Sequence, residues 1–209
     1  MEEVKPVLTI AGCGPGAREY LTLAAIDAAN RADYLVGAKR LLSLFPEASG
    51  RKLEISGAVE PALCLLDEKM REGKVALLVT GDPGISSLAA PAIKRFGAER
   101  CRVIAGVSSV QAAFAALGMP WTGARIISAH GGDPQEDGPP AERYAILLGR
   151  QESMAWAAGF ASRLDGDWAA WICQDIGLES QKIIRTTPGA LGEHEAPSLA
   201  LVILSKVEE

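Results

Sequence analysis

The sequence predicts an α/β protein made of two α/β domains, the first with a largely parallel sheet and the second with a mixed sheet. Short apolar runs alternate with helical patterns at βαβ spacing through residues 1–119. In residues 120–209 the last strand-like runs are joined by short or helix-poor segments, so we expect some antiparallel neighbours there. Residues 118–123, which contain two glycines and a proline, are the best candidate linker. We expect the two domains to meet along a cleft.

The first domain is expected to alternate strands and helices along its whole length. Proline and glycine mark several boundaries: Pro46 stops one helix, Pro61 lies in the first turn of the next, and Gly73 follows its end. We expect strands at residues 7–13, 34–37, 52–55, 75–79 and 102–105, and helices at residues 21–31, 38–45, 58–72, 88–96 and 110–117.

The run at residues 75–87 is the most informative stretch of the chain. Its five apolar residues, Val-Ala-Leu-Leu-Val, predict a strand buried on both faces. The strand should stop at Thr80-Gly81-Asp82-Pro83-Gly84, because Pro83 cannot continue a central strand. Ser86 or Ser87 can then cap the following helix. Such a turn either binds a ligand at the carboxyl end of the sheet or is only a tight connection capped by Asp82.

The second domain opens with a strand that leads into a long polar loop at residues 130–140. A loop of that length inside a compact domain is usually functional or mobile. His130, at the strand end, is either an acid/base or substrate contact or a residue that satisfies loop backbone, whereas His194 lies in a charged segment and should be solvated. We expect strands at residues 124–129, 144–148, 168–173, 181–186 and 199–204, and a helix at residues 152–164.

The composition favours a folded protein that binds neither nucleic acid nor membrane. Apolar residues make up 48% of the 209 positions, which is enough for a sizeable core. The net charge of −5 argues against a general nucleic-acid binder. The charged start of the sequence lacks the apolar core of a signal peptide, and no apolar run approaches the length of a membrane span. We therefore expect a cytoplasmic location.

The four cysteines do not suggest a metal or redox site. Cys13, Cys64, Cys101 and Cys173 lie far apart, and none forms a C-x-x-C motif. Three of them fall in or beside apolar runs, as buried free thiols in a reducing compartment do. We expect no bound metal.

A dinucleotide-binding fold is the sharpest competing interpretation. Residues 12–17 match G-x-G-x-x-A after a first strand, and Asp33 lies at the distance that this fingerprint requires. However, Asp33 precedes the second strand instead of ending it, and Pro15 removes one N–H donor from the glycine turn. A P-loop is not indicated, since no Gly-Lys-Ser/Thr follows the glycines. Residues 106–110 lack the last glycine of G-x-S-x-G, so Ser108 and Ser109 are better read as a helix N-cap.

Four motifs stand in a fixed order: Gly12-Cys13-Gly14-Pro15-Gly16, Ala32-Asp33-Tyr34-Leu35-Val36-Gly37, Thr80-Gly81-Asp82-Pro83-Gly84 and Ala105-Gly106-Val107-Ser108-Ser109-Val110-Gln111. This set resembles the tetrapyrrole (uroporphyrinogen/precorrin) methylase family, which uses S-adenosylmethionine. Further stretches, residues 36–42 and residues 117–121 with 128–131, look like the cobalamin-pathway branch that methylates C5 of precorrin-7 or of its cobalt form. The resemblance covers nearly the whole chain.

The resemblance implies that S-adenosylmethionine is held between the two domains. Loops of the first domain would hold it from one side, and backbone of the second would close over its adenine. The implied cofactor contacts are Gly81, Asp82, Pro83, Ile85, Ser86, Ser108 and Ser109 in the first domain and Leu148, Gln174, Leu199 and Ala200 in the second.

The same resemblance implies a precorrin-type tetrapyrrole substrate that faces Gly14, Pro15 and Gly16. A sulfonium methyl is already electrophilic, so the protein mainly has to position the reactants in a dry site. A proton must leave the substrate after attack, and we hypothesise that His130 or Asp82 accepts it. The substrate's carboxylates make Arg18, Lys39 and Arg40 plausible guides, although a solvated basic face is an equal alternative.

Two motifs depart from the branch pattern: His130-Gly131-Gly132 stands where His-Gly-Arg is usual, and Cys173-Gln174-Asp175-Ile176 stands where Cys-Glu-Arg-Leu is usual.

The resemblance also implies a homodimer and a separate partner that methylates C15 and decarboxylates. The alternatives are another precorrin methylase or a diphthine-forming or ribosomal-RNA relative. From a different class they are an NAD(P)-binding oxidoreductase or a non-catalytic nucleotide-binding module.

Overall fold

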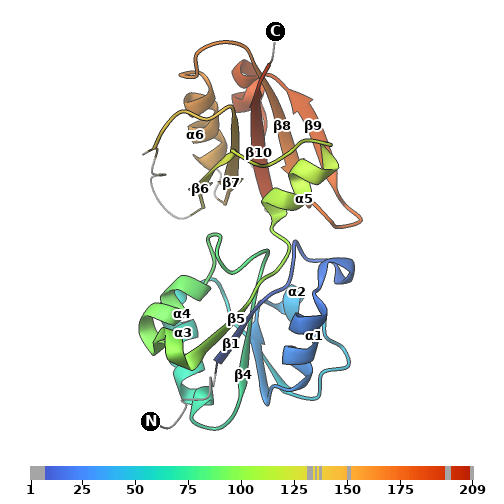
Figure 1. The fold of residues 1–209 in the computed structure, drawn as a ribbon, viewed down its shortest axis with the longest axis vertical. Coiled ribbons are helices and arrows are strands. Elements are labelled where there is room, and N and C mark those ends of the chain that lie inside the picture. Colours follow the sequence, from blue (N-terminus) through green and yellow to red (C-terminus); the bar gives the residue numbers. More distant parts are fainter. Residues whose placement is uncertain are drawn as a thin grey trace. The chain divides into compact units, whose positions relative to one another are not determined.

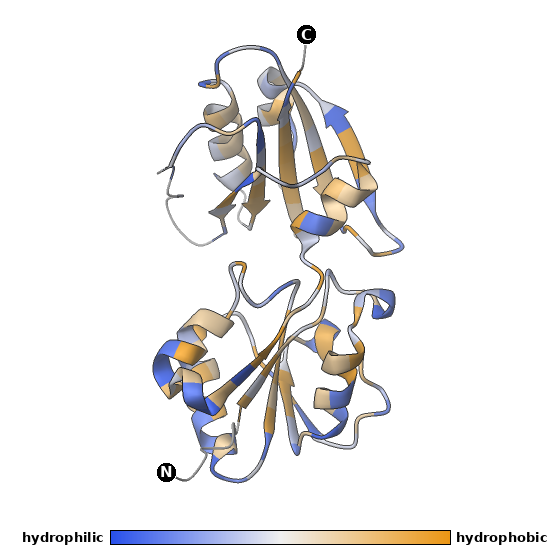
Figure 2. Cartoon of the chain, in the orientation of Figure 1, coloured by the Kyte–Doolittle hydropathy of each residue, from blue (hydrophilic) through white to orange (hydrophobic). Residues whose placement is uncertain are grey.

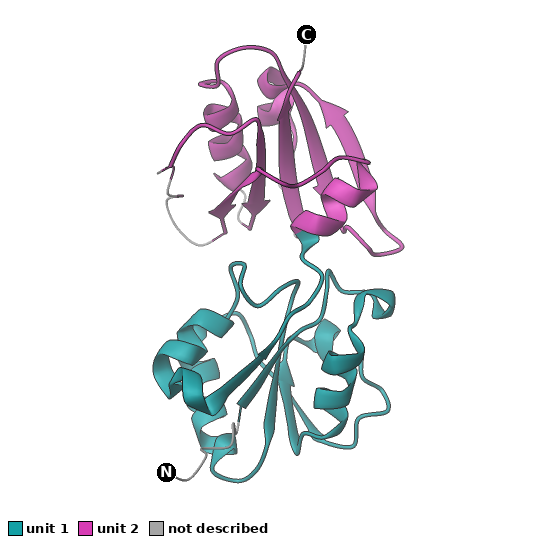
Figure 3. Cartoon of the chain, in the orientation of Figure 1, with its two compact units in different colours: residues 1–109 teal, residues 110–209 magenta. Residues whose placement is uncertain are grey.

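The computed structural model describes residues 8–130, 134, 136, 138–149, 152–195 and 199–207. The chain forms two compact units, Met1–Ser109 and Val110–Glu209 (Figure 3). We predicted the boundary after residue 119, whereas the division falls at the start of helix α5 (Ser109–Ala116). Gly118 and Pro120 end that helix locally, but packing decides which unit a helix joins, and α5 groups with the second unit.

Unit 1 contains a five-stranded sheet in the order β3-β2-β4-β1-β5, and every pair of neighbours is parallel (Figure 1). The prediction of a parallel sheet is therefore confirmed. The strands are β1 (Leu8–Gly12), β2 (Tyr34–Gly37), β3 (Arg51–Glu54), β4 (Val75–Val79) and β5 (Cys101–Ile104). The helices are α1 (Leu23–Asn30), α2 (Lys39–Leu42), α3 (Val59–Met70) and α4 (Ala89–Phe96), with short 3-10 turns at η1 (Arg18–Tyr20) and η2 (Ala98–Arg100).

Strand β4 lies at the middle of this sheet and is buried on both faces, as its apolar sequence predicted. Its side chains alternate between two cores. Val75, Leu77 and Val79 pack with residues of α3 and α4, whereas Ala76 and Leu78 pack with residues of α1 and α2. Helices therefore cover both faces of the sheet, so polar side chains gather at the two ends of its strands.

Unit 2 contains a mixed five-stranded sheet in the order β6-β7-β10-β8-β9. The pair β6–β7 is parallel, and the other three pairs are antiparallel, so the expectation of antiparallel neighbours is confirmed. Helix α6 and η3 cover one face through Met154, Phe160 and Leu191. The elements are β6 (Arg125–Ala129), β7 (Arg143–Leu148), α6 (Glu152–Ala161), β8 (Trp168–Gln174), β9 (Lys182–Thr186), η3 (Pro188–Glu193) and β10 (Ala200–Lys206).

The hydropathy of the chain follows these layers. The central strands of both sheets are the most hydrophobic segments, and blue residues gather on outward helix turns and loops (Figure 2). Each amphipathic helix packs its apolar face against a core and leaves its polar face to solvent. None of the helices among the described residues has the length and hydrophobicity of a membrane span.

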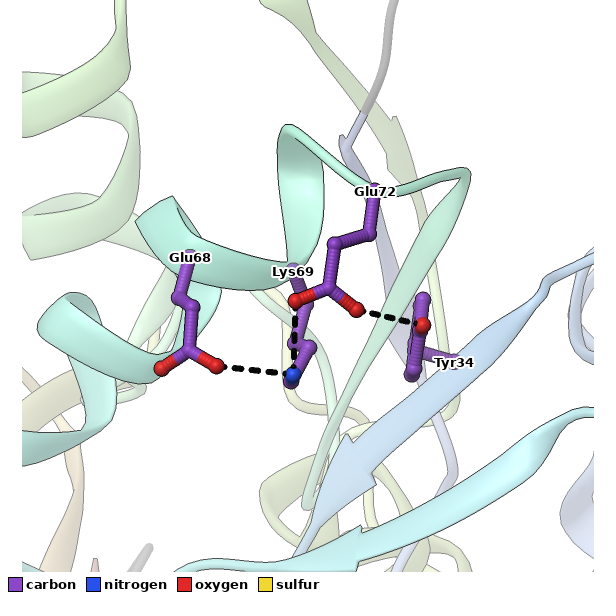
Figure 4. Close-up of polar contacts among 4 residues, drawn as sticks. All are labelled: Tyr34, Glu68, Lys69 and Glu72. Carbon is purple, nitrogen blue, oxygen red and sulfur yellow. Dashed lines mark hydrogen bonds and ion pairs between the residues drawn. The ribbon is translucent and has the colours of Figure 1, made fainter.

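The amino end of the unit 1 sheet carries a cluster of paired polar side chains (Figure 4). The Tyr34 hydroxyl donates to Glu72 at 2.6 Å, and the Lys69 ammonium lies 2.8 Å from both Glu68 and Glu72. The hydrogen bonds from Lys69 and Tyr34 lower the pKa of Glu72, whereas the Glu72 carboxylate raises the pKa of Tyr34. Lys69, Glu68 and Glu72 therefore each have an opposite charge beside them.

Candidate functional site

Three loops meet at the carboxyl edge of the unit 1 sheet, because β1, β4 and β5 are parallel neighbours that end there. Beyond the strands, the Cys13 N–H donates to the Val79 carbonyl at 2.9 Å, and the Gly81 N–H donates to the Gly14 carbonyl at 2.7 Å. The structure therefore joins the loop that we predicted to face substrate to the loop that we predicted to hold cofactor.

Asp82 ties the β4 loop to the β5 loop. One carboxylate oxygen accepts the Gly84 N–H at 2.8 Å, and the other accepts the Gly106 N–H at 3.1 Å. The Asp82 carbonyl accepts the Ile85 N–H at 3.1 Å, which closes the turn. The tight turn that the sequence predicted is therefore present, but Asp82 also reaches the neighbouring loop, and no local signal in the sequence predicts that contact.

Glycines allow the three loops to approach one another closely. A Cβ atom at Gly12 would lie 2.6 Å from the Gly106 nitrogen and 2.7 Å from the Gly81 oxygen. Gly81 itself has a φ of 67°, a conformation that glycine adopts readily. The glycine at position 12 is thus required by backbone packing between loops.

The remaining residues of the predicted cofactor set in unit 1 lie on these loops. Pro83 is buried, Ile85 is half-buried, and Ser86 is exposed with a φ of 44°. Ser108 is buried and Ser109 opens α5. Ser87 satisfies the start of α4: its hydroxyl accepts the Ala89 N–H at 3.1 Å and donates to the Pro83 carbonyl at 2.6 Å.

The three basic residues that we proposed as substrate guides have different surroundings. Arg18 forms an exposed ion pair with Glu47 at 3.0 Å, and Lys39 is exposed. Arg40 is half-buried, and its Nη2 donates to the Thr80 hydroxyl at the end of β4. Among the described residues, Arg40 is the one of these three that forms a hydrogen bond with the segment Thr80-Gly81-Asp82-Pro83-Gly84.

In unit 2 the register gathers the predicted cofactor residues at one edge of the sheet. Leu148 is the last residue of β7, Ala200 is the first of β10, and Ala200 pairs with Gln174, the last of β8. The antiparallel order β7-β10-β8 brings these ends together. Leu199 and Asp175 adjoin them, with φ values of 61° and 49°, and the Asp175 N–H donates to the Leu199 carbonyl at 3.2 Å. Such strain in residues other than glycine is concentrated at functional sites.

His130 lies at the same edge of the unit 2 sheet, just beyond β6. Its Nδ1 lies 3.0 Å from the Leu148 carbonyl, which can only accept, so Nδ1 carries the proton of this hydrogen bond. The ring therefore satisfies a backbone carbonyl at the end of β7, which is close to the second of the two roles that the sequence left open, and Nε2 stays available for another partner. Of the branch motif around it, Gly131 and Gly132 lie outside the described residues.

The geometry excludes the classic dinucleotide-binding arrangement. In that arrangement β1 lies beside β2, whereas here β4 separates them. The Asp33 carboxylate accepts the Lys74 N–H at 2.8 Å at the amino end of the sheet, opposite to the glycine loops. Helix α1 begins only at Leu23, after η1, so its N-terminus does not open from the glycine turn.

The cysteines have no partner that indicates redox or metal chemistry. Burial raises the pKa of Cys13 and of Cys173 to about 12. All four cysteines are unbridged, and the described residues contain no cluster of His, Cys, Asp or Glu that would hold a metal ion.

The chain is similar to proteins of one family. Residues 7–192 match the family described as Tetrapyrrole (Corrin/Porphyrin) Methylases. A protein of Methanocaldococcus jannaschii named "Probable cobalt-precorrin-7 C(5)-methyltransferase" is 30% identical over 190 residues, which cover 85% of this chain and 87% of that protein. The Salmonella typhimurium "Cobalt-precorrin-7 C(5)-methyltransferase" is 32% identical over 125 residues, which cover 60% of this chain and 62% of that protein.

Solved structures share the fold. A uroporphyrin-III-C-methyltransferase from Thermus thermophilus aligns with a TM-score of 0.76 at 25% identity, covering 96% of this chain and 94% of that one. A cobalamin biosynthesis precorrin-6Y methylase from Archaeoglobus fulgidus aligns with a TM-score of 0.72 at 19% identity, covering 98% and 99%. The chain therefore belongs to the tetrapyrrole (corrin/porphyrin) methylase family and is a methyltransferase.

Proposed function

We propose that this chain transfers a methyl group from S-adenosylmethionine to C5 of precorrin-7 or cobalt-precorrin-7 in cobalamin biosynthesis. The observation that carries the proposal is the 30% identity to the Methanocaldococcus jannaschii protein over 85% of this chain. The Salmonella relative has the same named activity. A relative named as a probable cobalt-factor III C(17)-methyltransferase is 28% identical over only 54% of this chain, so C5 is the better choice of carbon.

The family and the residues of the unit 1 loops support S-adenosylmethionine as the cofactor. Bound there, the cofactor would supply an electrophilic methyl group on a cationic sulfur. In unit 1, the loop of Gly81, Asp82 and Ser86 offers backbone groups, a carboxylate and a hydroxyl, which can form hydrogen bonds with the polar groups of this cofactor. A Thermus thermophilus relative of the same fold was solved with S-adenosyl homocysteine, which supports this choice of cofactor.

We assign cofactor contacts to each unit separately. In unit 1, Gly81, Pro83 and Ile85 would line the cofactor, with Ser108 and Ser109 on the next loop. In unit 2, the paired ends of β7, β10 and β8 would hold adenine through backbone at Leu148, Gln174, Leu199 and Ala200. The left-handed conformation of Leu199 and Ser86 supports this assignment, because folding would otherwise avoid that strain.

The substrate would lie against Gly14, Pro15 and Gly16, which the Gly14–Gly81 hydrogen bond fixes beside the cofactor loop. This placement lets the protein position the attacking carbon without adding a functional group of its own. Arg18, Lys39 and Arg40 remain the basic residues available to the substrate's carboxylates.

Between the two hypothetical proton acceptors, the hydrogen bonds favour His130. Both carboxylate oxygens of Asp82 already accept backbone N–H groups, so proton uptake there would weaken the loops. His130 has its Nδ1 proton engaged by the Leu148 carbonyl, which leaves the Nε2 lone pair as the base. Unchanged turnover in His130→Ala would exclude His130 from this role.

The test of the function is an assay with methyl-labelled S-adenosylmethionine and candidate precorrins, followed by location of the new methyl by NMR. We expect label at C5. Calorimetry separates the alternative class of NAD(P)-binding oxidoreductases: binding of S-adenosylhomocysteine without binding of NAD or NADP is expected, and the reverse would overturn the proposal.

We also propose a cytoplasmic homodimer that works with a separate C15-methylating decarboxylase. Light scattering that showed a monomer would contradict the dimer.

A further inference from the structure

We infer that Arg40 recognises a carboxylate of the tetrapyrrole substrate, with Thr80 as the residue that positions its guanidinium. The inference rests on the methyltransferase function proposed above and identifies one residue among the three basic candidates. It also places this recognition next to the predicted cofactor loop.

Arg40 is held at the carboxyl edge by the elements on either side of it. Strand β2 ends at Gly37, and α2 is anchored by the buried side chains of Leu41 and Leu42. From this short helix the Arg40 guanidinium reaches the hydroxyl of Thr80, the residue that directly precedes Gly81. The side chain is therefore fixed against the start of the Gly81-Asp82-Pro83 turn.

The charge on Arg40 has no acidic partner within the described residues. Burial lowers the pKa of Arg40, and the Cys13 thiol is the one group that opposes this effect. A half-buried cation without a counter-charge is unfavourable unless an anion joins it. The ion pairs of the described residues involve other basic side chains: Arg18, Arg31, Lys69, Arg71, Arg95 and Arg163.

A carboxylate is the anion that suits this arrangement. A guanidinium presents five N–H donors in a planar fork, and Thr80 accepts one of them. The others match the two oxygens of a carboxylate, which arginine binds in bidentate fashion. Arg18 already has Glu47 as its counter-ion, and Lys39 is an exposed point charge on a flexible stem, so neither has the same fixed geometry.

The test measures binding of a stable corrin, cobyrinic acid, and of its methyl ester to the full chain saturated with S-adenosylhomocysteine. In the wild-type protein the free acid should bind more tightly than the ester. In Arg40→Gln this preference should fall by roughly 10- to 100-fold, the effect of one charge-assisted contact. Arg40→Lys should recover part of the preference, and Thr80→Val should reduce it by a smaller factor, because the charge stays but loses its positioning.

The matched control is Arg71→Gln, which makes the same chemical change in an exposed ion pair with Asp67 at the other end of the sheet. It should leave the acid-to-ester ratio unchanged. A merely structural role for Arg40 would weaken acid and ester alike. Equal weakening, an unchanged ratio in Arg40→Gln, or no preference for the acid in the wild-type protein would each overturn the inference. Absence of S-adenosylhomocysteine binding by the wild-type chain would instead overturn the proposed function.

Discussion

Polar side chains at the two ends of the unit 1 sheet have different kinds of hydrogen-bond partner. At the amino end, side chains pair with each other: Tyr34 with Glu72, and Lys69 with both Glu68 and Glu72 (Figure 4). At the carboxyl end, the Asp82 carboxylate binds backbone N–H groups of two loops, and Arg40 binds an uncharged hydroxyl.

We infer from this difference that the amino end of the sheet serves local stability and the carboxyl end serves ligand binding. Paired charges on an exposed surface satisfy one another and contribute little beyond local stability. At the carboxyl end Gly12, Gly81 and Gly106 let the loops approach closely, and we propose that the half-buried Arg40 uses its remaining N–H donors for a ligand. A parallel sheet presents its loops at this end for the same topological reason in many enzymes.

The largest expected effect comes from breaking the close approach of the loops. In Gly106→Ala the new Cβ would meet the Gly81 carbonyl oxygen and would lie 2.7 Å from the Gly12 carbonyl carbon. Because backbone atoms cannot move aside as a flexible side chain can, we expect a loss of about 3 kcal/mol or more in the free energy of unfolding. Urea denaturation measures it.

Gly57→Ala is the matched control for this substitution. A Cβ at Gly57 meets no atom within 4 Å, so its free energy of unfolding should change by less than about 1 kcal/mol. A stability of Gly106→Ala equal to that of Gly57→Ala would show that the three glycines are not packed as described.

A smaller effect should follow when the loops are untied but not forced apart. Asp82→Ala removes the acceptors of the Gly84 and Gly106 N–H groups, so the binding-competent loop is less populated. We expect a loss of about 10-fold or more in S-adenosylhomocysteine affinity by calorimetry, and a smaller loss for Pro15→Ala. Equal or reversed losses would contradict the assignment of the Asp82 loop to the cofactor.

The smallest effect is expected at the amino end. The folded-state pKa of Glu72 lies below its ordinary value because Lys69 and Tyr34 donate to it, so its stabilisation is present above the unfolded pKa and is lost as pH falls through the folded one. Glu72→Gln should therefore lower Tm slightly at pH 7 and not at about pH 3. It should leave S-adenosylhomocysteine affinity unchanged. A clear loss of affinity would show that the amino end of the sheet also contributes to cofactor binding.

Much of the fold could be predicted from local pattern. The five apolar residues of β4 predicted a central buried strand, and Gly118 and Pro120 follow helix α5 where expected. Some boundaries were wrong by a few residues: α2 ends at Leu42 and α6 at Ala161, earlier than the patterns indicated. The short 3-10 turns were not predicted, because their three-residue period leaves too few residues to form a stripe.

The candidate site was predictable only in part. Gly81, Asp82 and Pro83 stand out because a Gly-Asp-Pro turn directly after a buried strand must end that strand. Thr80 was not identified as a functional residue, since its contact with Arg40 joins residues far apart in the chain. The glycine fingerprint at Gly12 pointed to a dinucleotide, and the position of β4 between β1 and β2 excluded that interpretation.

The sequence by itself determined the alternation of strands and helices, the buried character of β4 and the order of the family motifs, because these depend on periodicity and turn chemistry within short windows. Only the tertiary structure decided that β10 lies between β7 and β8, which brings Ala200 beside Gln174, and that Asp82 joins the Gly106 loop. It also decided that Arg40 is half-buried beside Thr80 with no acidic partner among the described residues. Strand order, loop contact and desolvation arise from packing between distant segments, and no local propensity encodes them.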